Sequence, residues 1–292
     1  MMSYRLPNSP RNTKNGAGIG AAVLILFAAI TIHSQQGTGL LTPAQQEAKK
    51  ELNEAARAYR EGKFDEAQRH SERALALDPE NRSAPMFVAR TIHAQFKPGD
   101  FTPENVTRAY DAIVAYQRIL ARNRLDDEAY KAIAYLYATI KEDELLRSWV
   151  LQRAADSSFD NERRAEAYVV LASKEWECSF KFTELPSHKT TIVKNQKASI
   201  KYHKAEDEIE FEQARQCAVR GLEISDLAIA LQSDSESAWS YKTNLLLELS
   251  KIAEMSGDVQ QKTELLQQYE AALNETTRLA QRASEQREKP KP

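Results

Sequence analysis

The chain of 292 residues contains few of the residues that break regular structure, with only 9 glycines and 10 prolines. Turn-rich all-β folds use more of both, so this composition argues against them. Charged residues make up 28% of the chain, but their signs nearly cancel, at a formal net charge of −2. The sequence also has no basic arm and no basic patch interleaved with aromatic residues, so we expect no nucleic-acid partner. The composition favours amphipathic helices with solvated outer faces.

Motifs of catalysis and cofactor binding are missing as well. The sequence contains no P-loop and no HExxH, GxSxG or CxxC pattern, so no familiar nucleotide, zinc or acyl-transfer site can be assigned. The five histidines stand singly, at positions 33, 70, 93, 188 and 203. His188 and His203 flank a predicted β-hairpin, where a two-histidine metal site without a third ligand is the less favoured alternative. We therefore predict a non-enzymatic protein with no catalytic residues, no cofactor and no metal.

The first 34 residues differ from the rest of the chain. Arg5, Arg11 and Lys14 precede an apolar run at residues 16–32. As a helix, this run would be about 25 Å long, near the lower limit for a membrane span. A basic segment before a short apolar run is typical of an export signal or an N-terminal anchor, and a buried core helix is the third alternative. Both main interpretations of residues 1–34 place the remainder of the chain outside the cytoplasm, because positive charge stays inside.

A polar linker is predicted at residues 35–47, and the segment at 48–81 then has the spacing of a helix-turn-helix unit. Five residues mark this unit: Gly62, Phe64, Ala67, Ala74 and Pro79. Glycine lets the chain turn where the first helix stops, and phenylalanine covers the corner with apolar surface. The two alanines share one helix face, where small side chains allow close approach of a neighbouring helix. Proline ends the second helix, because it has no N–H to donate.

Residues 48–81 resemble a tetratricopeptide repeat (TPR), a unit of about 34 residues. Four other segments resemble it more loosely, at residues 82–122, 127–157, 162–232 and 236–285. The resemblance implies an all-α fold, an α-solenoid of antiparallel helix pairs. We therefore expect the chain to comprise TPR-like repeats at 48–177, C-terminal TPR-like repeats at 207–287 and a tail at 288–292. The layout is also similar to exported bacterial repeat proteins. This similarity implies the periplasmic side of the cell envelope, with the chain secreted to the periplasm or anchored in the inner membrane.

A change of periodicity interrupts the helices at residues 178–206. Apolar and polar residues alternate here, and TTIVKNQKASIKY is typical of a β-hairpin that turns near residues 195–197. Inserted loops in repeat scaffolds often carry function; the alternative is a hairpin that only covers one edge of the stack. Cys178 begins the insertion and Cys217 follows it. In an oxidising compartment, we expect these cysteines either to form a disulfide or to remain two buried thiols.

In the family that the chain resembles, the leading helix of each pair lines a concave groove that binds peptides or partner proteins. Carried over position by position, the groove residues are Leu52, Tyr59, Arg60, Met86, Arg90, His93, Lys131 and Tyr135. Their aromatic and cationic side chains suit a partner segment that carries carboxylate groups. Arg60, Arg90 and Lys131 predict a weakly basic groove, whereas the alternative is a solvated helix face whose charges serve solubility.

These features predict a non-enzymatic TPR scaffold that mediates protein–protein interactions in the cell envelope, as an adaptor or assembly factor. Its partner would be a protein or peptide. The alternative function is a membrane-anchored structural accessory subunit of a membrane protein complex, held in the membrane by residues 16–32 if they are not cleaved.

Overall fold

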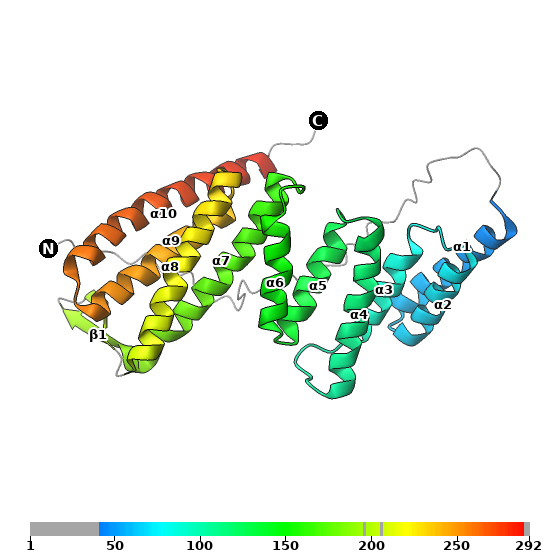
Figure 1. Cartoon of the computed structure of the whole chain (residues 1–292), viewed down its shortest axis with the longest axis horizontal. Coiled ribbons are helices and arrows are strands. Elements are labelled where there is room, and N and C mark those ends of the chain that lie inside the picture. Colours follow the sequence, from blue (N-terminus) through cyan, green and yellow to red (C-terminus); the bar gives the residue numbers. More distant parts are fainter. Residues whose placement is uncertain (1–40, 195–196, 205–206, 289–292) are drawn as a thin grey trace. The chain divides into compact units, whose positions relative to one another are not determined.

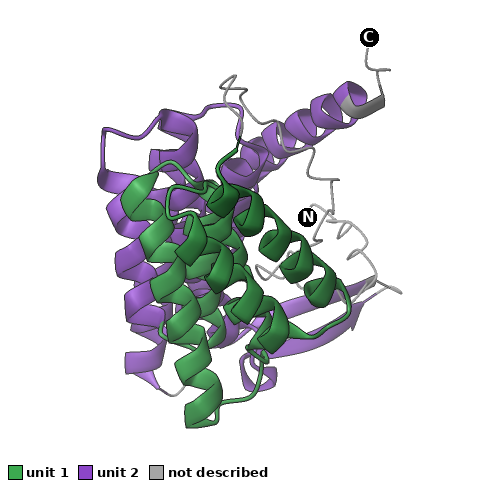
Figure 2. Ribbon diagram, turned by 90° about the vertical axis from the view of Figure 1, so that its right-hand side faces the viewer, with its two compact units in different colours: residues 1–142 green, residues 143–292 purple. Residues whose placement is uncertain are grey.

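The structure, a computed structural model, describes residues 41–194, 197–204 and 207–288. It divides into two compact units, unit 1 at Met1–Glu142 and unit 2 at Asp143–Pro292 (Figures 1 and 2). The predicted export signal or anchor at residues 1–34 lies outside the described residues, as does the last part of the predicted tail. In the described part of the chain, no helix combines the length and the apolar character needed to cross a membrane.

Unit 1 is helical throughout its described part. Its helices there are α1 (Pro43–Arg60), α2 (Phe64–Leu77), α3 (Ala84–Gln95), α4 (Pro103–Arg122) and α5 (Asp127–Thr139). Each helix packs against the next, and α1 also contacts α3. Contacts of each helix with the next one, and of α1 with α3, are characteristic of stacked helix pairs, which the repeat pattern predicted.

Helix α1 begins earlier than the repeat motif indicated. The Thr42 hydroxyl accepts a hydrogen bond from the backbone N–H of Gln45, and the Gln45 side chain accepts one from the N–H of Thr42. This reciprocal pair is a capping box. Pro43 occupies the first turn, where a missing N–H has no consequence. Residues 43–47 were expected in the linker but are helical, because Pro43 starts a helix here instead of breaking one.

The turn between α1 and α2 confirms the roles of the motif residues. Gly62 has a φ of 73°, in the left-handed region that glycine enters without a steric penalty. Ala67 and Ala74 are fully buried, which lets the neighbouring helices approach closely. Helix α2 ends at Leu77, two residues before Pro79, as the missing proline N–H requires.

The loop between α3 and α4 is organised by one buried amide, Asn105. Its side chain accepts a hydrogen bond from the backbone N–H of Lys97, at 2.9 Å, and donates to the carbonyl oxygens of Lys97 and Asp100, at 2.8 and 2.6 Å. Thr102 holds the N-cap position of α4, but its side chain makes no capping hydrogen bond. The loop is therefore fastened to the helix that follows it through Asn105.

Unit 2 combines helices with a two-stranded antiparallel sheet. Its described elements are α6 (Asp143–Ala155), α7 (Asn161–Thr183), a 3-10 helix (Pro186–His188), β1 (Lys189–Lys194), β2 (Lys197–Tyr202), α8 (Glu208–Leu231), α9 (Glu236–Ser256) and α10 (Val259–Glu288). Helix α7 packs against α6, α8 and α9, and α10 packs against α9. The sheet is the predicted β-hairpin, with Lys189 opposite Tyr202 and Lys194 opposite Lys197.

The insertion is shorter than the sequence pattern suggested, because α7 continues to Thr183. Residues 178–183 were expected in the insertion but belong to the helix. Glu175, Ser179 and Phe182 are all buried, and their spacing of four and three residues follows one helix face. Phe182 packs with Phe211 of α8 in a core cluster. This burial stabilises the last turns of α7, which local alternation alone did not reveal.

Helix α8 passes very close to its neighbours at Gly221. A Cβ atom at this position would lie 2.5 Å from Cδ2 of Leu245 in α9 and 2.9 Å from Cβ of Glu175 in α7. Only glycine therefore allows this approach, and the absence of a side chain at position 221 lets α7, α8 and α9 pack closely.

Candidate functional site

The predicted groove residues of unit 1 centre on an ion pair between α3 and α5. The Arg90 guanidinium donates two hydrogen bonds to the Glu128 carboxylate, both 2.6 Å long. These hydrogen bonds raise the pKa of Arg90 above its ordinary value. Tyr59 of α1 lies within electrostatic reach of both charges, and burial raises the pKa of its phenol. The Tyr59 ring also meets Phe64 at the corner of the first helix pair, with 5.2 Å between the ring centroids.

One turn further along α3, His93 contacts two tyrosines. Its ring centroid lies 5.9 Å from that of Tyr116 and 5.7 Å from that of Tyr135. Its Nδ1 shares a hydrogen bond of 3.2 Å with the Tyr116 hydroxyl. Burial lowers the pKa of His93, so its imidazole is neutral at neutral pH. Burial also raises the pKa of Tyr116, which stays a neutral donor or acceptor.

We call this set of side chains the Arg90 cluster. It comprises Tyr59, Arg90, His93, Tyr116, Glu128 and Tyr135. Four of its members were predicted from the sequence, and the structure brings these four together. The spacing of the repeat did not indicate Glu128 as a site residue, although Glu128 stands one helical turn before Lys131. Tyr116 of α4, which was not among the predicted groove residues, is buried, at 2% exposed.

The other four predicted groove residues have different environments. Leu52 packs against a core cluster of alanines and contributes to the stability of the first helix pair. Met86 is half-buried, whereas Arg60 and Lys131 are exposed. The basic character expected for the groove is weaker than predicted, because Glu128 matches the charge of Arg90.

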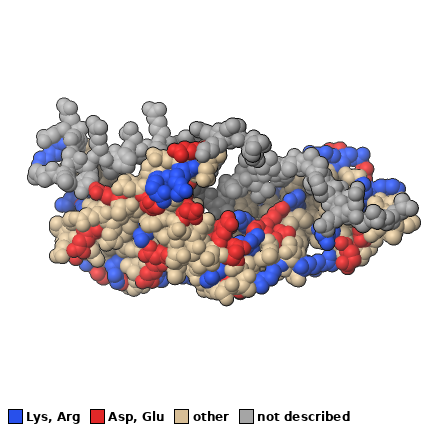
Figure 3. Space-filling model, turned by 90° about the horizontal axis from the view of Figure 1, so that it is seen from above, with Lys and Arg blue, Asp and Glu red and all other residues tan. Residues whose placement is uncertain are grey.

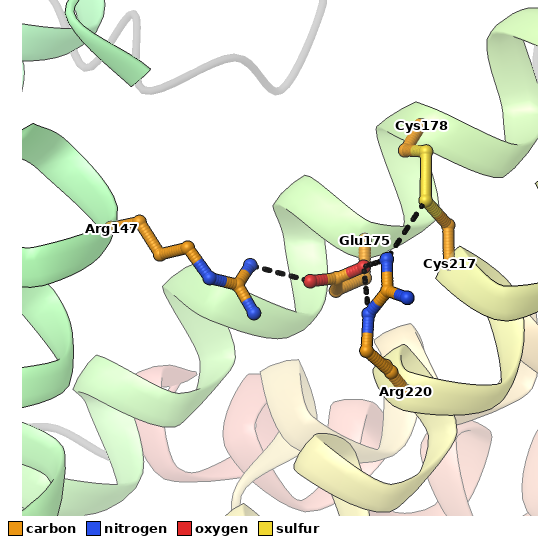
Figure 4. Close-up of a disulfide and its surroundings, with 5 residues drawn as sticks. All are labelled: Arg147, Glu175, Cys178, Cys217 and Arg220. Atoms are coloured by element: carbon orange, nitrogen blue, oxygen red, sulfur yellow. Dashed lines mark hydrogen bonds and ion pairs between the residues drawn. A yellow bond between two sulfur atoms is a disulfide. The ribbon is translucent and has the colours of Figure 1, made fainter. Parts of the chain in front are cut away.

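A second group of charged residues surrounds the two cysteines in unit 2. Cys178 of α7 and Cys217 of α8 form a disulfide in the structure, with their Cα atoms 6.1 Å apart (Figure 4). One turn before Cys178, the carboxylate of Glu175 is 4% exposed and receives hydrogen bonds from Arg147 of α6, at 2.5 Å, and from Arg220 of α8, at 3.0 Å. Arg220 also lies 3.3 Å from the Cys217 sulfur. The disulfide and the ion pairs together join α6, α7 and α8.

The histidines that flank the hairpin both have hydrogen-bond partners. Nδ1 of His188 donates to the carbonyl oxygen of Phe182, at 2.9 Å, and Nε2 of His203 lies 2.8 Å from the Thr190 hydroxyl. Among the described residues, no group of three or more histidine, cysteine, aspartate or glutamate side chains has the arrangement to hold a metal ion. The structure thus uses these rings to fasten the base of the hairpin.

Comparison with known proteins found similar solved structures but no similar sequence family. No protein-family model and no curated protein sequence matches the chain. Among solved structures, the chain is similar to MamA, with a TM-score of 0.38 and 13% identity over 81% of this chain and 95% of that one. It is similar to a tetratricopeptide repeat protein from Parabacteroides merdae, with a TM-score of 0.34 and 13% identity over 80% and 90%. It is also similar to PilF of Pseudomonas aeruginosa, with a TM-score of 0.32 and 11% identity over 84% and 100%.

Likeness at these TM-scores transfers no function from those proteins to this one. The fold is defined by the chain's own helices, with their buried alanines, a left-handed glycine turn and, within each unit, stacking of each helix on the next. In its described part, the chain has a TPR-like fold of stacked helix pairs with one β-hairpin.

Proposed function

We propose that the chain is a non-enzymatic scaffold of the cell envelope, which holds a partner protein on unit 1 through the Arg90 cluster. Stacked helix pairs present extended surfaces that repeat proteins commonly use for binding. The observation that supports this proposal most is the convergence of α1, α3 and α5 on one cluster of aromatic and ionic side chains. Aromatic and arginine side chains are enriched among the residues that dominate binding energy at protein interfaces.

The chemistry of the Arg90 cluster favours a partner with polar or charged groups over a purely apolar one. Glu128 and Arg90 present both signs of charge beside the tyrosine rings, and both are partly exposed, at 47% and 36% of their side chains. A partner carboxylate would compete with Glu128 for the guanidinium, and a partner cation would compete with Arg90 for the carboxylate. Affinity should therefore fall as ionic strength rises.

The location outside the cytoplasm is supported by two independent features. The basic residues and the apolar run at 16–32 have the pattern of an export signal or anchor. The disulfide between Cys178 and Cys217 is of the kind that persists in oxidising compartments and is rare in the cytosol. We therefore place the scaffold on the periplasmic side of a bacterial cell envelope.

Affinity purification from native membranes tests the scaffold proposal. Wild-type protein is compared with Arg60→Glu plus Arg90→Glu, and with the matched control Arg108→Glu plus Arg118→Glu, which changes two exposed arginines of α4. We expect the first variant to lose a partner that the wild type and the control retain, with all three equally helical by circular dichroism. Unchanged recovery of every co-purifying protein with the first variant would contradict the proposal.

The alternative is a membrane-anchored accessory subunit of a membrane protein complex, and the apolar run at 16–32 is the observation that favours it. Sequencing the N-terminus of the mature protein separates the two. A start near Gln35 indicates a soluble adaptor, and an intact start at Met1 or Met2 indicates the anchored subunit.

A further inference from the structure

The β-hairpin of unit 2 combines positive charge with exposed aliphatic side chains. Its strands carry four lysines and no acidic residue: Lys189, Lys194, Lys197 and Lys201. Val193, next to the turn, is 71% exposed, and Ile192 and Ile200 further along the strands are 42% and 43% exposed. β-branched residues suit strands, but strand formation does not require three of them to face solvent.

The base of the hairpin is held firmly on α7 and α9. Glu184, just after α7, accepts hydrogen bonds from Lys189 of β1 at 2.6 Å, from Tyr202 of β2 at 3.2 Å and from Lys251 of α9 at 2.9 Å. Lys251 also donates to the buried Glu248, at 2.7 Å. These contacts engage only the first residue of β1 and the last residue of β2, and the hairpin lies at one end of unit 2 (Figure 1).

Three acidic residues that follow the hairpin in the sequence are engaged within their own segment. The Asp207 side chain caps α8 by accepting hydrogen bonds from two backbone N–H groups. Glu208 pairs with Lys204, at 2.7 Å, and Glu212 pairs with Arg215, at 2.6 Å. These carboxylates therefore do not neutralise the strand lysines.

Other parts of the surface have mixed charge. On the face shown in Figure 3, blue and red groups alternate over the described residues. Many lysines and arginines also form ion pairs within their own helix, such as Lys50 with Glu47 and Arg278 with Glu275. Among the described residues, Lys194 and Lys201 have no such ion pair. The hairpin is thus a local concentration of positive charge in a chain of net charge −2.

From this arrangement, we propose that the β1–β2 hairpin docks end-on onto a lipid bilayer surface that carries anionic headgroups. Val193 would enter the headgroup region at the tip, while the lysines beside it contact lipid phosphates. A lysine near an anionic bilayer surface contributes attraction that adds up over several residues, and aliphatic side chains add apolar burial. This inference is independent of the Arg90 cluster and of a protein partner there.

A bilayer fits this tip better than an acidic protein does. Protein interfaces are enriched in aromatic residues and arginine and depleted in lysine, whereas all four strand cations are lysines. The aromatic residue of the strands, Tyr202, is already bonded to Glu184 at the base. The hairpin offers exposed aliphatic side chains on both of its faces, with lysines next to them in the strands. Such flexible point charges suit a fluid array of phosphates.

A tryptophan reporter tests this proposal in the full chain. Val193→Trp protein is mixed with vesicles of phosphatidylcholine and phosphatidylglycerol, or of phosphatidylcholine alone, and its fluorescence is compared with that of the wild type. Val259→Trp, at an equally exposed valine of α10, is the matched control. We expect a blue shift only for Val193→Trp, only with the anionic vesicles, and reversed by high salt. The apolar run at 16–32 can bind vesicles by itself, but it does not move the emission of a tryptophan at position 193.

Charge reversal provides the second measurement. Lys194→Glu plus Lys201→Glu should weaken the hairpin-dependent binding to anionic vesicles by roughly tenfold or more. The control, Lys49→Glu plus Lys97→Glu, makes the same change of net charge at exposed lysines of unit 1 and should have little effect. A blue shift with both vesicle types, or no blue shift at all, would overturn the proposal. Loss of an acidic protein partner from the hairpin variant, with vesicle binding intact, would overturn it in favour of protein docking.

Discussion

Arg90 and Glu128, which are 38 residues apart in the sequence, form a bidentate ion pair between consecutive leading helices of unit 1. Because both side chains remain partly solvated, the pair orients the surface more than it stabilises the fold. It also places a carboxylate against one of the three cations from which a basic groove was predicted. The cation that a partner carboxylate would meet is already bonded to a carboxylate of the protein itself.

A double-mutant cycle with Arg90→Ala and Glu128→Ala measures this pair. We expect a coupling in the free energy of unfolding of about 0.2 to 1 kcal/mol, the range measured for exposed ion pairs. High salt should reduce it. Urea titrations of the four proteins provide the values, and a coupling several times larger would mean that the pair is a structural element of the repeat.

Gly221→Ala is expected to destabilise unit 2, because the added methyl group would meet Leu245 and Glu175 at 2.5 and 2.9 Å. Overpacking of this kind typically costs about 1–3 kcal/mol. Alanine is the better helix former by nearly 1 kcal/mol, so a site with free space would show stabilisation instead.

The companion variant Leu245→Ala, combined with Gly221→Ala, tests the cause of that loss. If the clash with Leu245 dominates, the double variant will be more stable than the sum of the two single changes implies. Strict additivity of the two losses in denaturant titrations would show that contact with Leu245 is not responsible.

The pH dependence of stability should contain a contribution from Glu184. Burial opposes its charged form, but hydrogen bonds from Lys189 and Lys251 outweigh burial and lower its pKa from 4.5 to about 2. A lowered pKa means that the stabilisation is complete above the unfolded pKa, near 4.5, and is lost as the pH falls towards 2. The difference in stability between wild type and Glu184→Gln should shrink across this window. Glu248 has a raised pKa because of its burial and contributes with the opposite sign in both proteins.

The helix ends were predictable where their causes are local. Gly62 and Pro79 act through their own backbone chemistry, and both ended helices as expected. The ends that were missed depend on distant residues. Thr183 is held in α7 by a hydrogen bond to Glu248, 65 residues away in the sequence, and no local pattern reports it. For the candidate site, the spacing of the repeat indicated Arg90 and His93 on α3. It did not indicate that Glu128 of α5 faces Arg90.

The disulfide should be detectable chemically and energetically. Unfolded, non-reduced protein is expected to show no titratable thiol, and reduced protein to show two. Cys178→Ser plus Cys217→Ser should lower the free energy of unfolding by about 3–4 kcal/mol, as expected from loop closure over a separation of this length. Two free thiols in protein isolated without reductant would contradict both the bond and the proposed oxidising location.

Site-specific photocrosslinking in living cells tests the interaction scaffold most directly. Tyr135, in the Arg90 cluster, is replaced by azidophenylalanine in the otherwise native chain, and the same substitution at exposed Arg118 of α4 is the control. The proposal predicts a discrete covalent adduct with one protein from position 135, absent from position 118 and abolished by Arg60→Glu plus Arg90→Glu. No adduct at position 135, or the same adduct with and without the charge reversals, would contradict binding through this surface.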